Sequence, residues 1–83
     1  MDTEIEEQIS DELKVVMFKF GQKLQRLEEK KNDELEKSET ISKALGISLD
    51  MCFEIKKLIN EIMLEIKTIQ EKYSDDLKGE GNE

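Results

Sequence analysis

The stretch that decides the fold is SKALGISLD, residues Ser42–Asp50, near the middle of an 83-residue chain. Gly46 suits the left-handed conformation with which many helices end. Ser48 is a good N-cap, and an aspartate two residues later favours the first turn of a new helix. A stop signal followed directly by a start signal predicts a tight glycine turn at residues 46–48, with a long helix on either side.

The residues before this turn have the pattern of one long amphipathic helix, which we predict over residues 3–45. Glutamates near its start suit the positive end of the helix dipole. Residues 28–34 are all polar, and a break in the helix within residues 31–38 remains open, with Ser38 as a candidate cap. Apolar residues recur every three or four positions, which places them on one helix face: Ile5, Ile9, Leu13, Val16, Phe20, Leu24 and Leu27.

The residues after the turn predict a second and more apolar helix over residues 49–77. Its apolar residues alternate spacings of four and three, which is the heptad seam of a coiled coil: Ile55, Ile59, Ile62, Ile66, Ile69 and Tyr73. Residues 79–83 are polar and rich in glycine, so we predict a flexible acidic tail there. Residues 1–78 then form a single helical hairpin domain.

Folding the chain at Gly46 brings the two apolar stripes together. Counting outward from the turn pairs Leu27 with Ile66 and Leu24 with Ile69, and this agreement between two separate patterns supports an antiparallel hairpin. The polar run of the first helix would lie opposite a very apolar part of the second, which leaves apolar surface uncovered. We therefore predict an all-α fold, a two-helix hairpin within a dimeric or hetero-oligomeric helical bundle or coiled coil.

The composition limits what the chain can bind. It has 41% charged residues, a formal net charge of −8, one cysteine and no histidine. A disulfide or a metal therefore cannot staple this short chain, and self-association or a partner chain remains. The acidic balance disfavours nucleic acid, and no segment approaches the ~20 apolar residues of a membrane helix. The acidic start is unlike a signal peptide, so we expect a soluble, intracellular (cytoplasmic) protein without membrane contact.

The stretch around Gly46 that predicts the turn also resembles the core of a helix-turn-helix DNA-binding unit. Residues 41–48 place an apolar residue, a small residue and then Leu-Gly-Ile-Ser at the spacing of that motif, with Cys52 and Ile55 following. The resemblance implies a small regulator that binds DNA, or a DNA-binding protein by mimicking DNA charge. Against it, the positions after the turn include Asp50 and Glu54, which repel phosphate and are not the usual readers of base edges.

Catalytic signatures do not occur in this sequence. It has no glycine-rich phosphate loop, no Ser–His or Cys–His pair and no metal-ligand cluster, so we expect no enzyme activity and no cofactor. The paired carboxylates lie in polar runs with lysines and indicate solvated helix faces. Cys52 has acidic neighbours, and we expect it to be a small packed side chain rather than a reactive thiol.

The function we predict is a non-enzymatic interaction or assembly subunit, or an adaptor, that acts through a helical-bundle interface. Its partner is itself, as a dimer or tetramer, or another helical protein. Gly46 and Ser48 are the predicted turn and capping residues. The predicted interface residues are Val16, Phe20, Leu24, Leu27, Ile55, Ile59, Ile62, Met63, Ile66 and Ile69.

Overall fold

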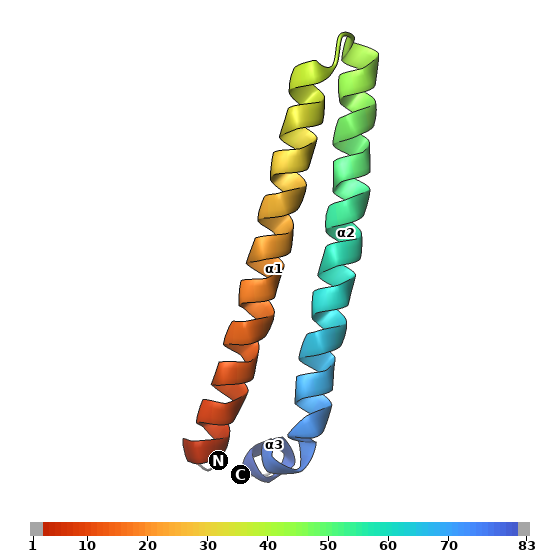
Figure 1. Cartoon of the computed structure of the whole chain (residues 1–83). Helices are drawn as coiled ribbons and strands as arrows, with labels where there is room; N and C mark the ends of the chain where they lie inside the picture. The colour runs from red at the N-terminus through yellow and green to blue at the C-terminus, as the bar shows by residue number, and fades with distance from the viewer. Residues whose placement is uncertain (1–2, 82–83) are drawn as a thin grey trace.

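The fold is an antiparallel hairpin of two long helices. The computed structural model describes residues 3–81, which form α1 (Thr3–Lys37), α2 (Ile41–Lys72) and α3 (Ser74–Gly81) and contain no strand. α1 and α2 pack side by side, and the short α3 turns across the open end near the start of α1 (Figure 1). The molecule is a rod with Cα extents of 59 × 19 × 16 Å. The all-α hairpin predicted from the sequence is thereby confirmed.

The hairpin turns at residues 38–40, earlier in the chain than predicted. The Ser38 hydroxyl donates to the Leu35 carbonyl at 2.7 Å, and the Ser38 N–H donates to the same carbonyl at 3.2 Å, which closes α1. Thr40 has extended backbone angles, φ −131° and ψ 153°, and its hydroxyl accepts the N–H of Lys43 at 3.1 Å. Thr40 is therefore the N-cap of α2. The possible helix break within residues 31–38 therefore does occur, and it lies directly after Lys37, where α1 ends.

The predicted turn at residues 46–48 is wrong, and so are the predicted helix bounds of 3–45 and 49–77. Gly46 lies inside α2 and has no positive φ, while the Ser48 hydroxyl donates to the Ala44 carbonyl at 2.9 Å, a bond typical of a serine within a helix. Glycine costs only about 1 kcal/mol inside a helix, so it does not force a turn where packing favours a continuous one. The helix-turn-helix resemblance lacks its turn in this structure.

The core of the hairpin is small and lies between α1 and α2. Its buried apolar side chains are Val16, Leu58, Ile62 and Tyr73. Because the turn lies at residues 38–40 and not at residues 46–48, the two helices pair in a different register from the predicted one. Leu27 lies beside Leu58 in a shallow groove, and not beside Ile66 as predicted.

The buried Tyr73 forms the junction between α2 and α3. Its N–H donates to the Ile69 carbonyl at 3.2 Å, and its own carbonyl accepts the Leu77 N–H at 3.0 Å, which starts α3. Leu77 then lies near Ile9 and Leu13 of α1. Residues 79–81 of the predicted flexible tail continue α3 as helix, and residues 82–83 lie outside the described part. The flexibility of this tail stays a prediction.

Candidate interaction surface

Ion pairs between α1 and α2 lie along one long side of the hairpin. Lys23 contacts Glu61 at 3.3 Å, and Lys72 contacts Glu12 at 2.7 Å. Glu12 and Lys23 are eleven residues apart, as are Glu61 and Lys72, and eleven residues make about three helical turns. The two pairs therefore lie on the same side of the hairpin, where acidic and basic groups of the chain satisfy each other.

A third set of ion pairs lies on this side near the turn and centres on Lys31. Lys31 is only 3% exposed, and its Nζ lies 2.5 Å from Asp50, 3.2 Å from Glu34 and 3.5 Å from Glu54. The hydrogen bond to Asp50 raises the pKa of Lys31 well above its usual range and lowers the pKa of Asp50. Because a buried ammonium needs these partners, the cluster favours one pairing of α1 with α2.

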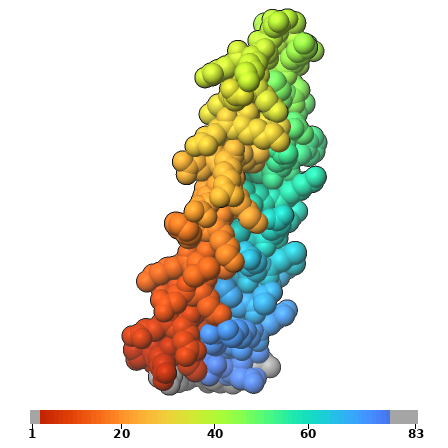
Figure 2. All heavy atoms as spheres, in the orientation of Figure 1, coloured from red at the N-terminus to blue at the C-terminus, as the bar shows by residue number. Residues whose placement is uncertain are grey.

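α2 exposes large apolar side chains along nearly its whole length. Their exposed fractions run from 38% for Ile66 to 81% for Ile41. The space-filling view shows a narrow rod (Figure 2), and α1 packs only against α2 along its length, so much of each helix faces outward. Apolar patches this extended are typical of interaction surfaces. The exposed large apolar residues of α2 are Ile41, Leu45, Leu49, Phe53, Ile59, Met63, Leu64 and Ile66.

The predicted interface residues divide into two groups in the structure. The first lies buried or half-buried between α1 and α2: Val16, Phe20, Leu24, Leu27, Ile55, Ile62 and Ile69. The second is exposed and consists of Ile59, Met63 and Ile66. The hairpin brings the first group together and leaves the second group to face outward.

The sequence pattern did not predict the part of the apolar surface that lies nearest the turn. Ile41, Leu45, Leu49 and Phe53 are all more than half exposed, and their regular spacing of four residues within one helix could have revealed them. The misplaced turn at Gly46 concealed this pattern because it divided the four residues between two helices. Cys52 lies on the same part of α2 and is exposed, so it does not pack within the hairpin itself.

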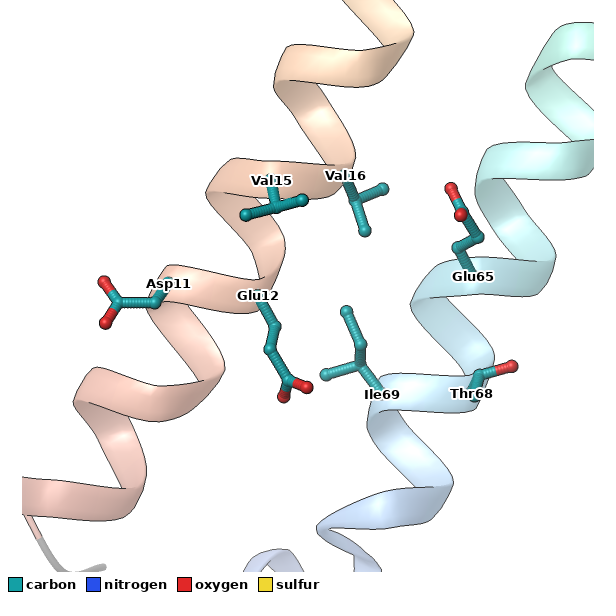
Figure 3. Close-up of a pocket in the computed structure, with 7 residues that line it drawn as sticks. All are labelled: Asp11, Glu12, Val15, Val16, Glu65, Thr68 and Ile69. Atoms are coloured by element: carbon teal, nitrogen blue, oxygen red, sulfur yellow. The ribbon is translucent and has the colours of Figure 1, made fainter.

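A shallow groove of about 410 Å³ lies between α1 and α2 toward the open end. Val16 and Ile69 point toward each other across it, whereas Asp11 points away from α2 (Figure 3). Glu12 already contacts Lys72, which lowers the pKa of Glu12. The lining residues include no nucleophile paired with a base, so the groove is an open part of the hairpin core: Asp11, Glu12, Val15, Val16, Glu65, Thr68 and Ile69.

Among the side chains that the structure describes, no group of three or more histidine, cysteine, aspartate or glutamate residues is arranged to hold a metal ion. None of the described helices combines the length and the apolar character that crossing a membrane requires.

Comparison with known proteins gives no relative from which a role could be transferred. No protein-family model matches the chain, and no match is found among curated proteins or solved structures. The described residues form a two-helix hairpin with ion pairs along one side, a long row of exposed apolar side chains on α2 and a shorter exposed group on α1, Val15, Met17 and Phe18.

Proposed function

We propose that this chain is a non-enzymatic assembly subunit or adaptor that acts through a helical-bundle interface. The observation that supports this proposal is the row of exposed large apolar side chains on α2. Such a row is unfavourable in water and favourable against another apolar helix. The hairpin buries few apolar residues of its own, so covering this row would also add to its stability.

The charge distribution supports the same proposal. The ion pairs Lys23–Glu61 and Lys72–Glu12 lie on one side of the hairpin, which stays in water when a partner covers the apolar row. The net charge of −8 keeps such an assembly soluble. In this proposal the protein works in solution inside the cell, where the exposed thiol of Cys52 stays reduced.

Site-specific photo-crosslinking in the producing cells tests the proposal. A benzophenone amino acid replaces Ile59, which is 44% exposed in the apolar row, and in a matched control it replaces the exposed Lys57 on the charged part of α2. We expect a discrete protein adduct from position 59 and none from position 57. The absence of any adduct, or equal adducts from both positions, would contradict an interface on this surface.

A further inference from the structure

α2 carries two heptad seams, and the hairpin uses only one of them. The seam that faces α1 alternates spacings of four and three, and all but Ser48 are buried or half-buried: Ala44, Ser48, Met51, Ile55, Leu58, Ile62, Glu65 and Ile69. Moving one residue forward from each of these gives a second seam of the same spacing, in which every residue is exposed: Leu45, Leu49, Cys52, Lys56, Ile59, Met63, Ile66 and Gln70. Six of these eight residues are apolar.

The two seams are separated by the angle that lies between the two contact faces of a helix at the corner of a four-helix bundle. One residue along an α-helix is a rotation of about 100°. Neighbouring helices of a four-helix bundle contact a given helix from directions about a quarter turn apart, through coiled-coil-like seams. α2 can therefore hold α1 on its first seam and another helix on its second seam at the same time.

We propose that the second seam of α2 packs against the second seam of α2 from a second copy of this chain, in antiparallel orientation. This inference rests on the proposed function and names the partner. A two-fold symmetric contact needs a surface that is complementary to itself. Antiparallel heptad pairing provides this, because Leu49 lies opposite Ile66 of the second copy and Cys52 lies opposite Met63 of the second copy.

The position of Lys56 favours the antiparallel orientation over the parallel one. In a parallel pair in register, Lys56 would face Lys56 of the second copy, and like charges repel. In the antiparallel pair it lies opposite Ile59, where its aliphatic stem packs while the ammonium reaches water. No carboxylate occurs in the second seam, so this contact buries no unpaired acid.

The second seam supplies the apolar centre of the proposed dimer interface. Five of its large apolar side chains are between 38% and 62% exposed: Leu45, Leu49, Ile59, Met63 and Ile66. A standard protein–protein interface buries about 800 Å² on each partner. A second copy therefore covers these five side chains, whereas Leu64 beside the seam stays outside the contact.

Disulfide trapping tests the orientation. In a Cys52→Ser background, Leu49→Cys and Ile66→Cys are made as separate proteins and oxidised alone or mixed. We expect a disulfide-linked heterodimer in the mixture and little linkage in either protein alone, because only the antiparallel pair places positions 49 and 66 together. Efficient linkage of Leu49→Cys to itself would show a parallel pair and overturn the proposal, and so would the absence of linkage in every sample.

Light scattering on a sizing column tests the surface with neighbouring residues of α2. Met63 and Leu64 are 49% and 64% exposed, but only Met63 belongs to the second seam. We expect a dimer for the natural sequence, dimerisation weakened roughly thirtyfold or more by Met63→Glu, and an unchanged dimer for Leu64→Glu. Circular dichroism should show the same helicity in all three, because both side chains lie outside the core.

A natural chain that is monomeric at all concentrations would overturn the dimer. The photo-crosslinking experiment separates this failure from a failure of the proposed function. An adduct at position 59 with twice the mass of the chain supports both proposals. An adduct with another mass supports only the proposed function and overturns the second copy as partner.

Discussion

The half of the hairpin near the turn and the half toward the open end are held together by different interactions. Near the turn, the most buried side chain is Lys31, whose ammonium lies among three carboxylates. From the middle toward the open end, the buried side chains are Val16, Leu58, Ile62 and Tyr73. Apolar stripes can pair in several registers, whereas a buried charge must meet its partners. The comparison indicates that apolar burial supplies most of the stability and that charge specifies which residues meet.

The largest expected effect comes from removing apolar burial at the middle of the rod. Ile62 is 8% exposed, so Ile62→Ala should lower the free energy of unfolding by about 2–4 kcal/mol, as measured by urea denaturation. Leu64→Ala is the control, because Leu64 is 64% exposed and the change should stay within about 0.5 kcal/mol. Equal losses of unfolding free energy in the two variants would contradict the placement of Ile62 in the core and of Leu64 outside it.

A smaller effect should follow from acid, and it should begin at the turn. The Lys31 ammonium lowers the pKa of Asp50 below its ordinary value of 3.8, so Asp50 binds protons more weakly in the folded chain than in the unfolded chain. The stability that this carboxylate contributes is therefore complete above about pH 4 and is lost as the pH falls through the lowered value.

Amide hydrogen exchange between pH 5 and pH 2 measures this acid effect. Residues 41–54 should lose protection before the residues around Ile62. Asp50→Asn should already lower protection of residues 41–54 at pH 5 and should reduce its further loss in acid. If both halves lost protection together and Asp50→Asn changed nothing, charge would not distinguish the turn from the rest of the hairpin.

A stabilising change of modest size should come from Gly46. A Cβ added there would meet nothing within 4 Å, and the residue is helical. Gly46→Ala should therefore raise the free energy of unfolding by about 0.5–1 kcal/mol and raise the melting temperature. Gly21→Ala, which also has open space in α1, should act in the same direction. A loss of stability at position 46 alone would favour a turn there instead of at residues 38–40.

The smallest expected effect is spectroscopic and concerns the open end. The neighbouring Glu12 carboxylate raises the pKa of Tyr73, and Tyr73 is the only tyrosine in a chain without tryptophan. Ultraviolet titration should give a midpoint above the ordinary value of about 10, and Glu12→Gln should lower that midpoint. Since the raised pKa favours the neutral phenol in the folded chain, this contribution to stability is lost as the pH rises above 10. An unchanged midpoint in Glu12→Gln would contradict the contact.

The fold class was predictable from the sequence because spacings of three and four continue over most of the chain. The position of the turn was not predictable, although Gly46 and Ser48 are stronger local signals for a turn than Ser38 and Thr40. Ser38 and Thr40 close α1 and cap α2, and the turn between them allows Lys31 to meet Asp50. That contact depends on the pairing of two helices, and the small cost of glycine in a helix could not outweigh it.

The candidate surface was predictable only in part, for the same reason. Ile59, Met63 and Ile66 were expected to be apolar interface residues and are exposed, whereas Ile62 belongs to the core of the hairpin. Leu45 and Leu49 were assigned to the region around a turn that does not form there. Which helix face remains uncovered depends on the register of the hairpin, and the register is not a property of either stripe alone.

The turn at residues 38–40 also determines the order in which the hairpin can close. The partners Lys31 and Asp50 are 19 residues apart in the chain, whereas Lys72 and Glu12 are 60 residues apart. Bringing distant residues together costs more chain entropy, so the contacts near the turn form at the lowest cost. We expect α1 and α2 to join from the turn outward and to fold rapidly, as proteins with local contacts do. The buried charge of Lys31 would then be among the first long-range contacts that the chain makes, and the packing of Tyr73 would be among the last.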